Sequence, residues 1–405
     1  MAEKEFSLRG LRIIDFTHVA SGPNATKILA DLGAEVIKVE GPKRPDLIRR
    51  AGPFPGNRPG LNSGGMYNSW NTSKLSLTLD LGHSKGVDLV RRLICFSDVV
   101  IDNFSPRVME RWGLAYKDLV QLKPDIIVVN LPSQGMTGPH REYISFGAEL
   151  MALGGIACAT GFSQGRPTGP DVNYPDYPVA SLAAFAILAA LRFRKKTGKG
   201  QHIDLSQFEV TVSLWGPAMM DFIENQRLPI RRGNSSAVAA PYGVYRCQGE
   251  ERWCAIAVSD ESQWQNLCRA MGKPELAQDS RFQTLLARLK NASVLDEIIE
   301  QWTLGRSPEE VMATLQKREV PSGVVQNGKD LLQDPHLKKR GYYIELPHPE
   351  EKKMLYQRPA MILSRTPARV KRAPILGEHR DYVLRAILKL TAAEIAELVQ
   401  EGACN

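Results

Sequence analysis

The sequence predicts an α/β protein in which a doubly wound, Rossmann-like parallel sheet is joined to a smaller α+β domain. Short β-branched runs alternate with segments of helical spacing over roughly the first 130 residues. The run Asp125–Leu131 is apolar almost throughout, as strands are when helices cover both faces of a parallel sheet. After Arg232 the pattern changes to a hairpin followed by amphipathic helices. The 405 residues are enough for two or three domains.

The first strand–helix–strand unit sets the expected topology. Leu11–Phe16 is a β-branched run, Asn24–Leu32 has helical spacing and is ended by Gly33, and Glu35–Glu40 is the second strand. So compact a βαβ unit implies parallel strands with a right-handed crossover. The same alternation continues with the helix Gly86–Phe96 and the strands Ser76–Leu81, Val99–Asp102 and Asp125–Leu131.

The stretch from Asn173 to Glu209 holds the longest expected helix. Ala180–Arg192 is rich in alanine and apolar nearly all round, which is typical of a buried helix. Pro178 fits the first turn, and Asp176 lies at or just before the start. Capping preferences favour Asp176 as a helix cap. The other interpretation is a carboxylate nucleophile at the mouth of the helix, and the residues of this stretch leave both open.

The rest of the chain predicts one more apolar helix, Val210–Asn225, and then the small domain. Its hairpin joins Tyr242–Tyr245 to Trp253–Val258, and its helices are Trp264–Met271, Arg281–Lys290, Val294–Trp302 and Pro308–Arg318. A strand pair around Tyr343 and Pro359 and a final helix follow. We therefore expect a large domain over residues 1–222, a small one over 232–328 and a C-terminal segment over 329–405.

The composition limits the kinds of binding partner and site that we expect for this protein. The chain has 52 basic and 44 acidic residues, a formal charge of +8, but no block of like charge, so we expect small polyanions and not nucleic acid. The first βα turn, Thr17–Pro23, has one glycine and lacks the dinucleotide fingerprint. The six cysteines show no metal-ligand spacing, so neither a metal site nor a disulfide is expected. No signal segment is evident, and no apolar run approaches the roughly 18 residues of a membrane span, so we expect a cytoplasmic protein.

An ordered set of short motifs then points to a family. The motifs are Ser21-Gly22-Pro23, Leu32–Glu40, Asn71–Lys74, Asp102–Pro106, Thr197–Asp204 with Glu209, Pro241–Tyr245, Asp334–His336, His348-Pro349 and Ala373–His379. Each is weak alone, but together and in this order they resemble the class III (family III) CoA-transferases along nearly the whole chain.

The resemblance implies a function for Asp176. In that family an aspartate at this distance before the end of the alanine-rich run is the nucleophile, and it forms an aspartyl anhydride and then an aspartyl-CoA thioester. A CoA thioester, with succinyl-CoA the expected donor, is then a substrate, and no ATP, metal or tightly bound cofactor is needed. The expected acceptor is a carboxylic acid, such as an aryl or alkyl dicarboxylate of the benzylsuccinate type.

The resemblance also implies a CoA pocket. It carries over the first βα loop, Lys74 as a phosphate partner, Asn103 and Phe104 beside the pantetheine or adenine, and two residues of the next helix. Relatives often have arginine where this chain has Gly41, and Lys43 or Arg44 is the candidate replacement. For each basic residue the alternative is a solvated surface side chain. The full set is His18, Val19, Ala20, Ser21, Lys43, Arg44, Trp70, Lys74, Asn103, Phe104, Met109 and Arg111.

Two other functions stay open. Relatives that racemise 2-methylacyl-CoA pair the aspartate with a histidine, where this chain has Phe146 and, nearby, Glu149. Since a two-base racemase needs a second acid or base, transfer is favoured. A non-catalytic subunit of a heteromeric transferase is the third interpretation. Trp70, Phe146, Trp215, Met219 and Tyr242 could line an apolar acceptor pocket or simply fill cores. The family further implies interlocked rings, as a homodimer or heterodimer, with the C-terminal segment returning to the large domain.

Overall fold

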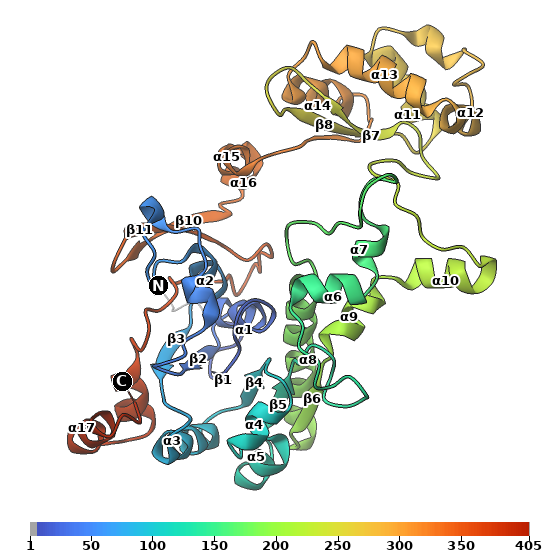
Figure 1. Ribbon diagram of the computed structural model, residues 1–405. Coiled ribbons are helices and arrows are strands. Elements are labelled where there is room, and N and C mark those ends of the chain that lie inside the picture. The colour runs from blue at the N-terminus through green and yellow to red at the C-terminus, as the bar shows by residue number, and fades with distance from the viewer. Residues whose placement is uncertain (1–5, 405) are drawn as a thin grey trace. The chain divides into compact units, whose positions relative to one another are not determined.

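A computed structural model describes residues 6–404, which form two compact units (Figure 1). The first unit contains the chain up to Ile156, then Gly169–Leu228, and then the chain from Lys339 onward. The second contains Ala157–Thr168 and Pro229–Lys338. The chain therefore leaves the first unit twice and returns to it twice.

The first unit is built on a six-stranded parallel sheet, which confirms the α/β prediction. The strand order is β3-β2-β1-β4-β5-β6, the doubly wound order that reverses between β1 and β4. β2 and β4 have the predicted bounds, and β1 and β5 are shorter than predicted at both ends. β3 begins one residue before the predicted Ser76–Leu81 and ends at Thr78. The strands are β1 (Arg12–Asp15), β2 (Glu35–Glu40), β3 (Leu75–Thr78), β4 (Val99–Asp102), β5 (Ile127–Asn130) and β6 (Gln201–Asp204).

Helices cover both faces of this sheet. On one face Ile14, Ile37 and Val100 join a core with α3 and the C-terminal residues. On the other, Ile13, Val36 and Val99 join a core with α1 and α8. The helices of the unit are α1 (Ser21–Asp31), α2 (Gly65–Trp70), α3 (Ser84–Cys95), α4 (Arg107–Arg111), α5 (Tyr116–Leu122), α6 (Gly147–Leu153), α7 (Ile156–Ala159), α8 (Asp176–Thr197), α9 (Gln207–Ser213), α10 (Gly216–Asn225) and α17 (Ala392–Gln400). In this list α7 lies at the crossing into the second unit.

The prediction of one helix over Val210–Asn225 is wrong. The chain forms α9 and α10, with a break at Leu214 and Trp215. Pro217 lies in the first turn of α10, where its missing N–H costs nothing, but the same residue interrupts a continuous helix.

The C-terminal segment contains a π-helical stretch, Tyr382–Ile387, and ends in a bridge between Cys404 and Leu79 beside β3. The strand pair before it is β10 (Tyr343–His348) with β11 (Lys352–Gln357). Pro359 lies beyond the second strand, and not within the pair.

The second unit has a three-stranded antiparallel sheet, β7 (Tyr242–Arg246), β8 (Trp253–Ala257) and β9 (Ser322–Val324). Trp264, Phe282 and Ile299 lie in its core. Its α12 is shorter than predicted because Thr284 caps it, accepting a hydrogen bond from the Ala287 N–H. Its helices are α11 (Glu261–Ala270), α12 (Leu285–Lys290), α13 (Ala292–Thr303), α14 (Pro308–Gln316), α15 (Gly328–Gln333) and α16 (Pro335–Lys339).

One helix corrects an expectation about membranes. Within residues 6–404, α8 is the single helix with the length and apolar composition to cross a bilayer. It passes that test because alanines and few charges occupy its middle, a pattern that buried core helices share. Val179, Ala183 and Ile187 of α8 are buried in the core over the sheet, whereas Leu182, Phe185 and Leu188 are exposed.

Candidate active site

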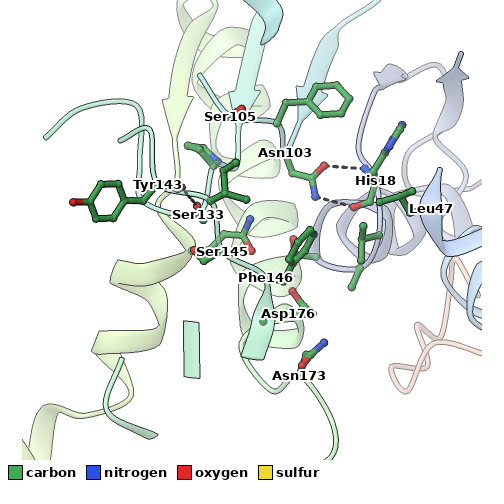
Figure 2. Close-up of a pocket in the computed structure, with 18 of the residues that line it drawn as sticks. His18, Leu47, Asn103, Ser105, Ser133, Tyr143, Ser145, Phe146, Asn173 and Asp176 are labelled. Atoms are coloured by element: carbon green, nitrogen blue, oxygen red, sulfur yellow. Dashed lines mark hydrogen bonds between the residues drawn. The ribbon is translucent and has the colours of Figure 1, made fainter. Parts of the chain in front are cut away.

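A pocket of about 500 Å³ lies at the carboxyl end of the six-stranded sheet (Figure 2). It spans the loops after β1 and β4, where the strand order reverses, which is the usual ligand site in doubly wound sheets. Its volume suits a small organic substrate. The lining residues are His18, Val19, Ala20, Ser21, Leu47, Asn103, Phe104, Ser105, Pro132, Ser133, Arg141, Tyr143, Ile144, Ser145, Phe146, Gly147, Asn173, Asp176 and Gln207.

Asp176 opens α8 and faces this pocket. Its side chain is buried to 9% exposure, yet its carboxylate accepts no hydrogen bond and forms no ion pair with any described residue. It therefore does not act as a helix cap. Burial raises the pKa of Asp176 to about 6, because the charged form loses hydration without gaining a partner.

Gly147 makes room for this carboxylate. A Cβ atom on Gly147 would lie 2.5 Å from the Asn173 Cβ and 3.1 Å from the Asp176 Oδ2. The first distance is closer than side chains can approach, so α6 can start beside Asp176 only because its first residue is glycine.

The loop after β1 is held by side chains rather than by a backbone ladder. The Thr17 N–H donates to Asp15 Oδ1 at 2.8 Å, and the Thr17 carbonyl accepts from Lys38 Nζ at 2.6 Å. The Asn103 amide forms two hydrogen bonds with the backbone of His18. It accepts one from the His18 N–H and donates one to the His18 carbonyl, both at 2.8 Å (Figure 2). The Val19 N–H donates to Asp46 Oδ1 at 2.9 Å.

Buried ion pairs lie beneath this loop. Lys74 pairs with Asp15 at 2.9 Å, and Lys38 pairs with Asp46 at 2.9 Å, with all four side chains inaccessible to solvent. Burial alone would raise the pKa of Asp15, but Lys74 and Lys38 lower it to about 2. Burial lowers the pKa of His18, and the charge of Lys38 lowers it further, so both favour the neutral imidazole.

A second buried carboxylate supports the loop after β4. Asp102 accepts hydrogen bonds from the Phe104 N–H at 3.1 Å and from the Asn130 amide at 2.5 Å. Asn130 in turn contacts the His202 ring nitrogen Nε2 at 2.6 Å. Burial raises the pKa of Asp102 to about 7. The chain of contacts links the ends of β4 and β5 to β6 and fixes the loop that carries Asn103.

The structure brings seven of the predicted site residues together at the pocket. They are His18, Val19, Ala20, Ser21, Asn103, Phe104 and Asp176. Phe146, a candidate for the acceptor pocket, also lines it.

The other predicted residues lie elsewhere. Lys74 is 3% exposed and donates to Asp15, the Pro23 carbonyl and Asn71, so its ammonium has no N–H left for a phosphate in this conformation. Met109 is 3% exposed and belongs to the core.

Four more lie away from the lining residues, three of them on the surface. Lys43, Arg44 and Arg111 are exposed, and Lys43 lies 3.6 Å from Asp80. Trp70 is half-buried and packs against the small cluster around Ile48 and Tyr67, which also includes Val19.

Sequence reasoning missed most of the pocket wall. Pro132 and Ser133 follow the carboxyl end of β5, and the rule that ligands bind beyond strand ends could have found them. Segment 141–145 and Gln207 carried no motif or periodicity. Among the described lining residues, Arg141 is the one lysine or arginine.

Comparisons with known proteins agree on one family. The family model described as CoA-transferase family III matches residues 8–380. The succinyl-CoA–D-citramalate CoA-transferase of Chloroflexus aurantiacus is 32% identical over 96% of both chains. The succinate–glutarate CoA-transferase of Agrobacterium fabrum is 32% identical over 95% of this chain and 96% of that one.

A solved structure supports the fold. A CAIB/BAIF family protein from Brucella suis matches with a TM-score of 0.85 and 31% identity, over 94% of this chain and 99% of that one. With a family model across most of its length, and with these relatives, the chain is a CoA-transferase and belongs to CoA-transferase family III.

Proposed function

We propose that this enzyme transfers CoA through Asp176 as a covalent nucleophile. An Asp176 oxygen attacks the thioester carbonyl of the donor, the C–S bond breaks, and a mixed anhydride and CoA thiolate form. The thiolate attacks the aspartyl carbonyl carbon and releases the donor acid, leaving an aspartyl-CoA thioester. The acceptor carboxylate then runs the same two steps in reverse, which regenerates Asp176.

The observation that supports this proposal is the buried carboxylate of Asp176, which has no described partner and lies in the pocket. A carboxylate without a cation keeps its electron density for attack, and its raised pKa makes it more basic than a solvated aspartate. Exclusion of water by the pocket would also protect the anhydride from hydrolysis.

Within this proposal the acyl-CoA lies along the loops after β1 and β4. His18, Val19, Ala20 and Ser21 meet Asn103 and Phe104 there, and the His18 ring contacts Phe104 edge-on at 5.2 Å. For the phosphates, we propose the exposed cations Lys43, Arg44 and Arg111, because Lys74 is committed to Asp15.

We propose succinyl-CoA as the donor and a dicarboxylic acid as the acceptor. Two of the relatives are named for transfer involving succinate or succinyl-CoA and aliphatic dicarboxylates. Arg141 gives the pocket one cationic group, and Tyr143 and Phe146 give it aromatic surface. An aryl-substituted succinate such as benzylsuccinate is therefore the acceptor to compare first with glutarate and citramalate.

The test replaces Asp176 with Asn and incubates each protein with succinyl-CoA, then with hydroxylamine. In the wild type, mass spectrometry should find a hydroxamate on Asp176. The Asp176→Asn variant should lose transfer while still binding CoA. Asp171→Asn, which changes an exposed aspartate nearby, is the matched control and should keep both. Transfer by Asp176→Asn at the wild-type rate would refute the mechanism.

A racemase is less well supported. Phe146 lines the pocket without offering a base, and the exposed Glu149 carboxylate accepts the Phe146 N–H at 2.9 Å. Solvent deuterium entering an acyl-CoA without an acceptor acid would favour it. A non-catalytic subunit is tested by purifying the chain alone, since transfer by that preparation excludes it.

For assembly, we propose interlocked rings of two chains in the cytoplasm. We propose domains at 1–222, 232–328 and 329–405. The chain leaves the first unit after Leu228 and returns to it at Lys339, which supports such a ring. The exposed apolar residues of α8 and α10, such as Phe185 and Ile223, are candidates for the contact between subunits. All six cysteines are free, as suits a reducing compartment. Light scattering of the wild type and of Phe185→Glu tests the assembly, and a monomeric wild type would refute it.

A further inference from the structure

Val19 has a backbone conformation that its residue type avoids. Its φ is 67°, in the left-handed region, and it is the one β-branched residue among the non-glycine residues with positive φ in the described chain. The branched Cβ clashes with the backbone there, so a valine stays in this region only where its surroundings hold it. Val19 also lines the pocket.

The surroundings that hold it are a buried ion pair. Asp46 Oδ1 accepts the Val19 N–H at 2.9 Å, and Asp46 Oδ2 lies 2.9 Å from Lys38 Nζ. Lys38 Nζ also donates to the Thr17 carbonyl at 2.6 Å. The pair therefore forms hydrogen bonds with the loop on both sides of His18, and the Asn103 amide binds the backbone of His18 itself.

The backbone polar groups of this loop therefore fall into two sets, those with hydrogen-bond partners and those without. Five consecutive backbone groups, from the Thr17 N–H to the Val19 N–H, are bound by side chains of other elements or of Asp15. The next two N–H groups, of Ala20 and Ser21, have no partner in the described chain, although both residues are at most 3% exposed and line the pocket. The turn at Val19 leads directly into α1 and leaves these donors at the pocket wall.

We propose that Lys38 and Asp46 are positioning residues for acyl-CoA binding. They do not line the pocket. They hold Val19 in its left-handed conformation so that the loop from Thr17 to Ser21 presents its free N–H groups to the substrate before it arrives. The inference rests on the proposed use of this loop for acyl-CoA.

The test is Asp46→Asn, which keeps the size of the side chain and an oxygen acceptor but removes the charge that pairs with Lys38. The KM for succinyl-CoA should rise about tenfold, the usual effect of weakening a charged hydrogen bond. The KM for the acceptor acid and kcat should change by less than about threefold.

The matched control is Asp31→Asn. Asp31 is equally buried and pairs with Lys27 at 2.8 Å, but it lies away from the pocket. A purely structural effect would lower the melting temperature of both variants and leave both KM values alone. The positioning role predicts that the KM for succinyl-CoA rises in Asp46→Asn and stays unchanged in Asp31→Asn.

A double mutant separates the effect of backbone strain at Val19 from a general loss of structure. Val19→Gly removes the cost of the left-handed conformation, since glycine adopts it freely. In that background Asp46→Asn should raise the KM for succinyl-CoA by about twofold or less, instead of about tenfold. The same factor in both backgrounds, or an unchanged KM in folded Asp46→Asn, would overturn the inference. A failure of the proposed function is recognised separately, because it would appear as transfer by the Asp176→Asn variant.

Discussion

The buried carboxylate of Asp176 predicts a specific pH dependence of transfer. Only the ionised form can attack a thioester, and burial raises the pKa of Asp176 to about 6. At pH 5 about a tenth of such a group is ionised, whereas a solvated aspartate would be more than about nine-tenths ionised. The kcat/KM for succinyl-CoA should therefore fall to about a tenth of its plateau at pH 5, and about tenfold more for each further pH unit.

The same raised pKa predicts that the Asp176→Asn variant, which should be inactive, is more stable than the wild type. The folded pKa of Asp176 lies above its ordinary value of 3.8, so the folded state binds the proton more tightly than the unfolded state does. The free energy of unfolding should therefore decrease as pH rises from about 4 to 6 and stay lower above that range. The shift of about two pKa units corresponds to at most about 3 kcal/mol.

Asp176→Asn removes this penalty, because an amide carries no charge to desolvate. Urea unfolding at pH 8 should show the variant more stable than the wild type by up to about 3 kcal/mol, and the difference should vanish near pH 4. Asp171→Asn, at an exposed site, should change neither stability nor the pH profile. An acid limb near pH 4 in the wild type, or a variant less stable at pH 8, would refute the link between burial, pKa and attack.

Three further substitutions test the frame around the site. Gly147→Ala places a Cβ 2.5 Å from the Asn173 Cβ, so the start of α8 must shift. The kcat should then fall at least about tenfold while CoA still binds, and an unchanged kcat would contradict this prediction. Gly200→Ala brings a Cβ within 2.1 Å of the Ile126 carbonyl oxygen, so urea unfolding should show a free energy of unfolding lower by about 3 kcal/mol. A decrease below about 1 kcal/mol would contradict this prediction. Burial raises the pKa of Asp102 to about 7, so Asp102 should add to the loss of stability as pH rises from about 4 to 7. When unfolding midpoints are measured across that range, the decline should be smaller in Asp102→Asn, which keeps only the part due to Asp176, and an equal decline would contradict this.

The sheet was predictable from the sequence for a physical reason. Strands such as Val99–Asp102 are buried along their whole length, and apolar, β-branched residues fill all but the last position of this one. The long helix α8 was visible from its alanines, and it begins at Asp176, which the sequence placed at or just before the start. The break between α9 and α10 was missed because the apolar pattern runs through Pro217, and pattern alone does not register the missing N–H.

The pocket was only partly predictable, because its members depend on contacts distant in sequence. Lys74 sits in a family motif, but its role follows from Asp15, 59 residues earlier, and the sequence does not show that the two meet. Arg141 and Tyr143 lie on a loop without periodicity and become pocket residues only through the course of that loop. The strained turn at Val19 had no sequence signal at all, since valine is a residue that the left-handed region disfavours.

Two buried aspartates of the first unit show how the fold divides carboxylate roles. Asp15 is surrounded by Lys74, Lys38 and two threonine hydroxyls, and its pKa is about 2. Its charge is compensated on every side, which makes it a stable anchor for the loop and a poor nucleophile. Asp176 is nearly as buried but has no partner among residues 6–404, and its pKa is about 6. Desolvation without compensation raises the free energy of the charged form, and in the proposed mechanism attack on a thioester carbon releases that free energy. The residue type is the same, so the difference in chemistry comes entirely from what the fold brings to each oxygen.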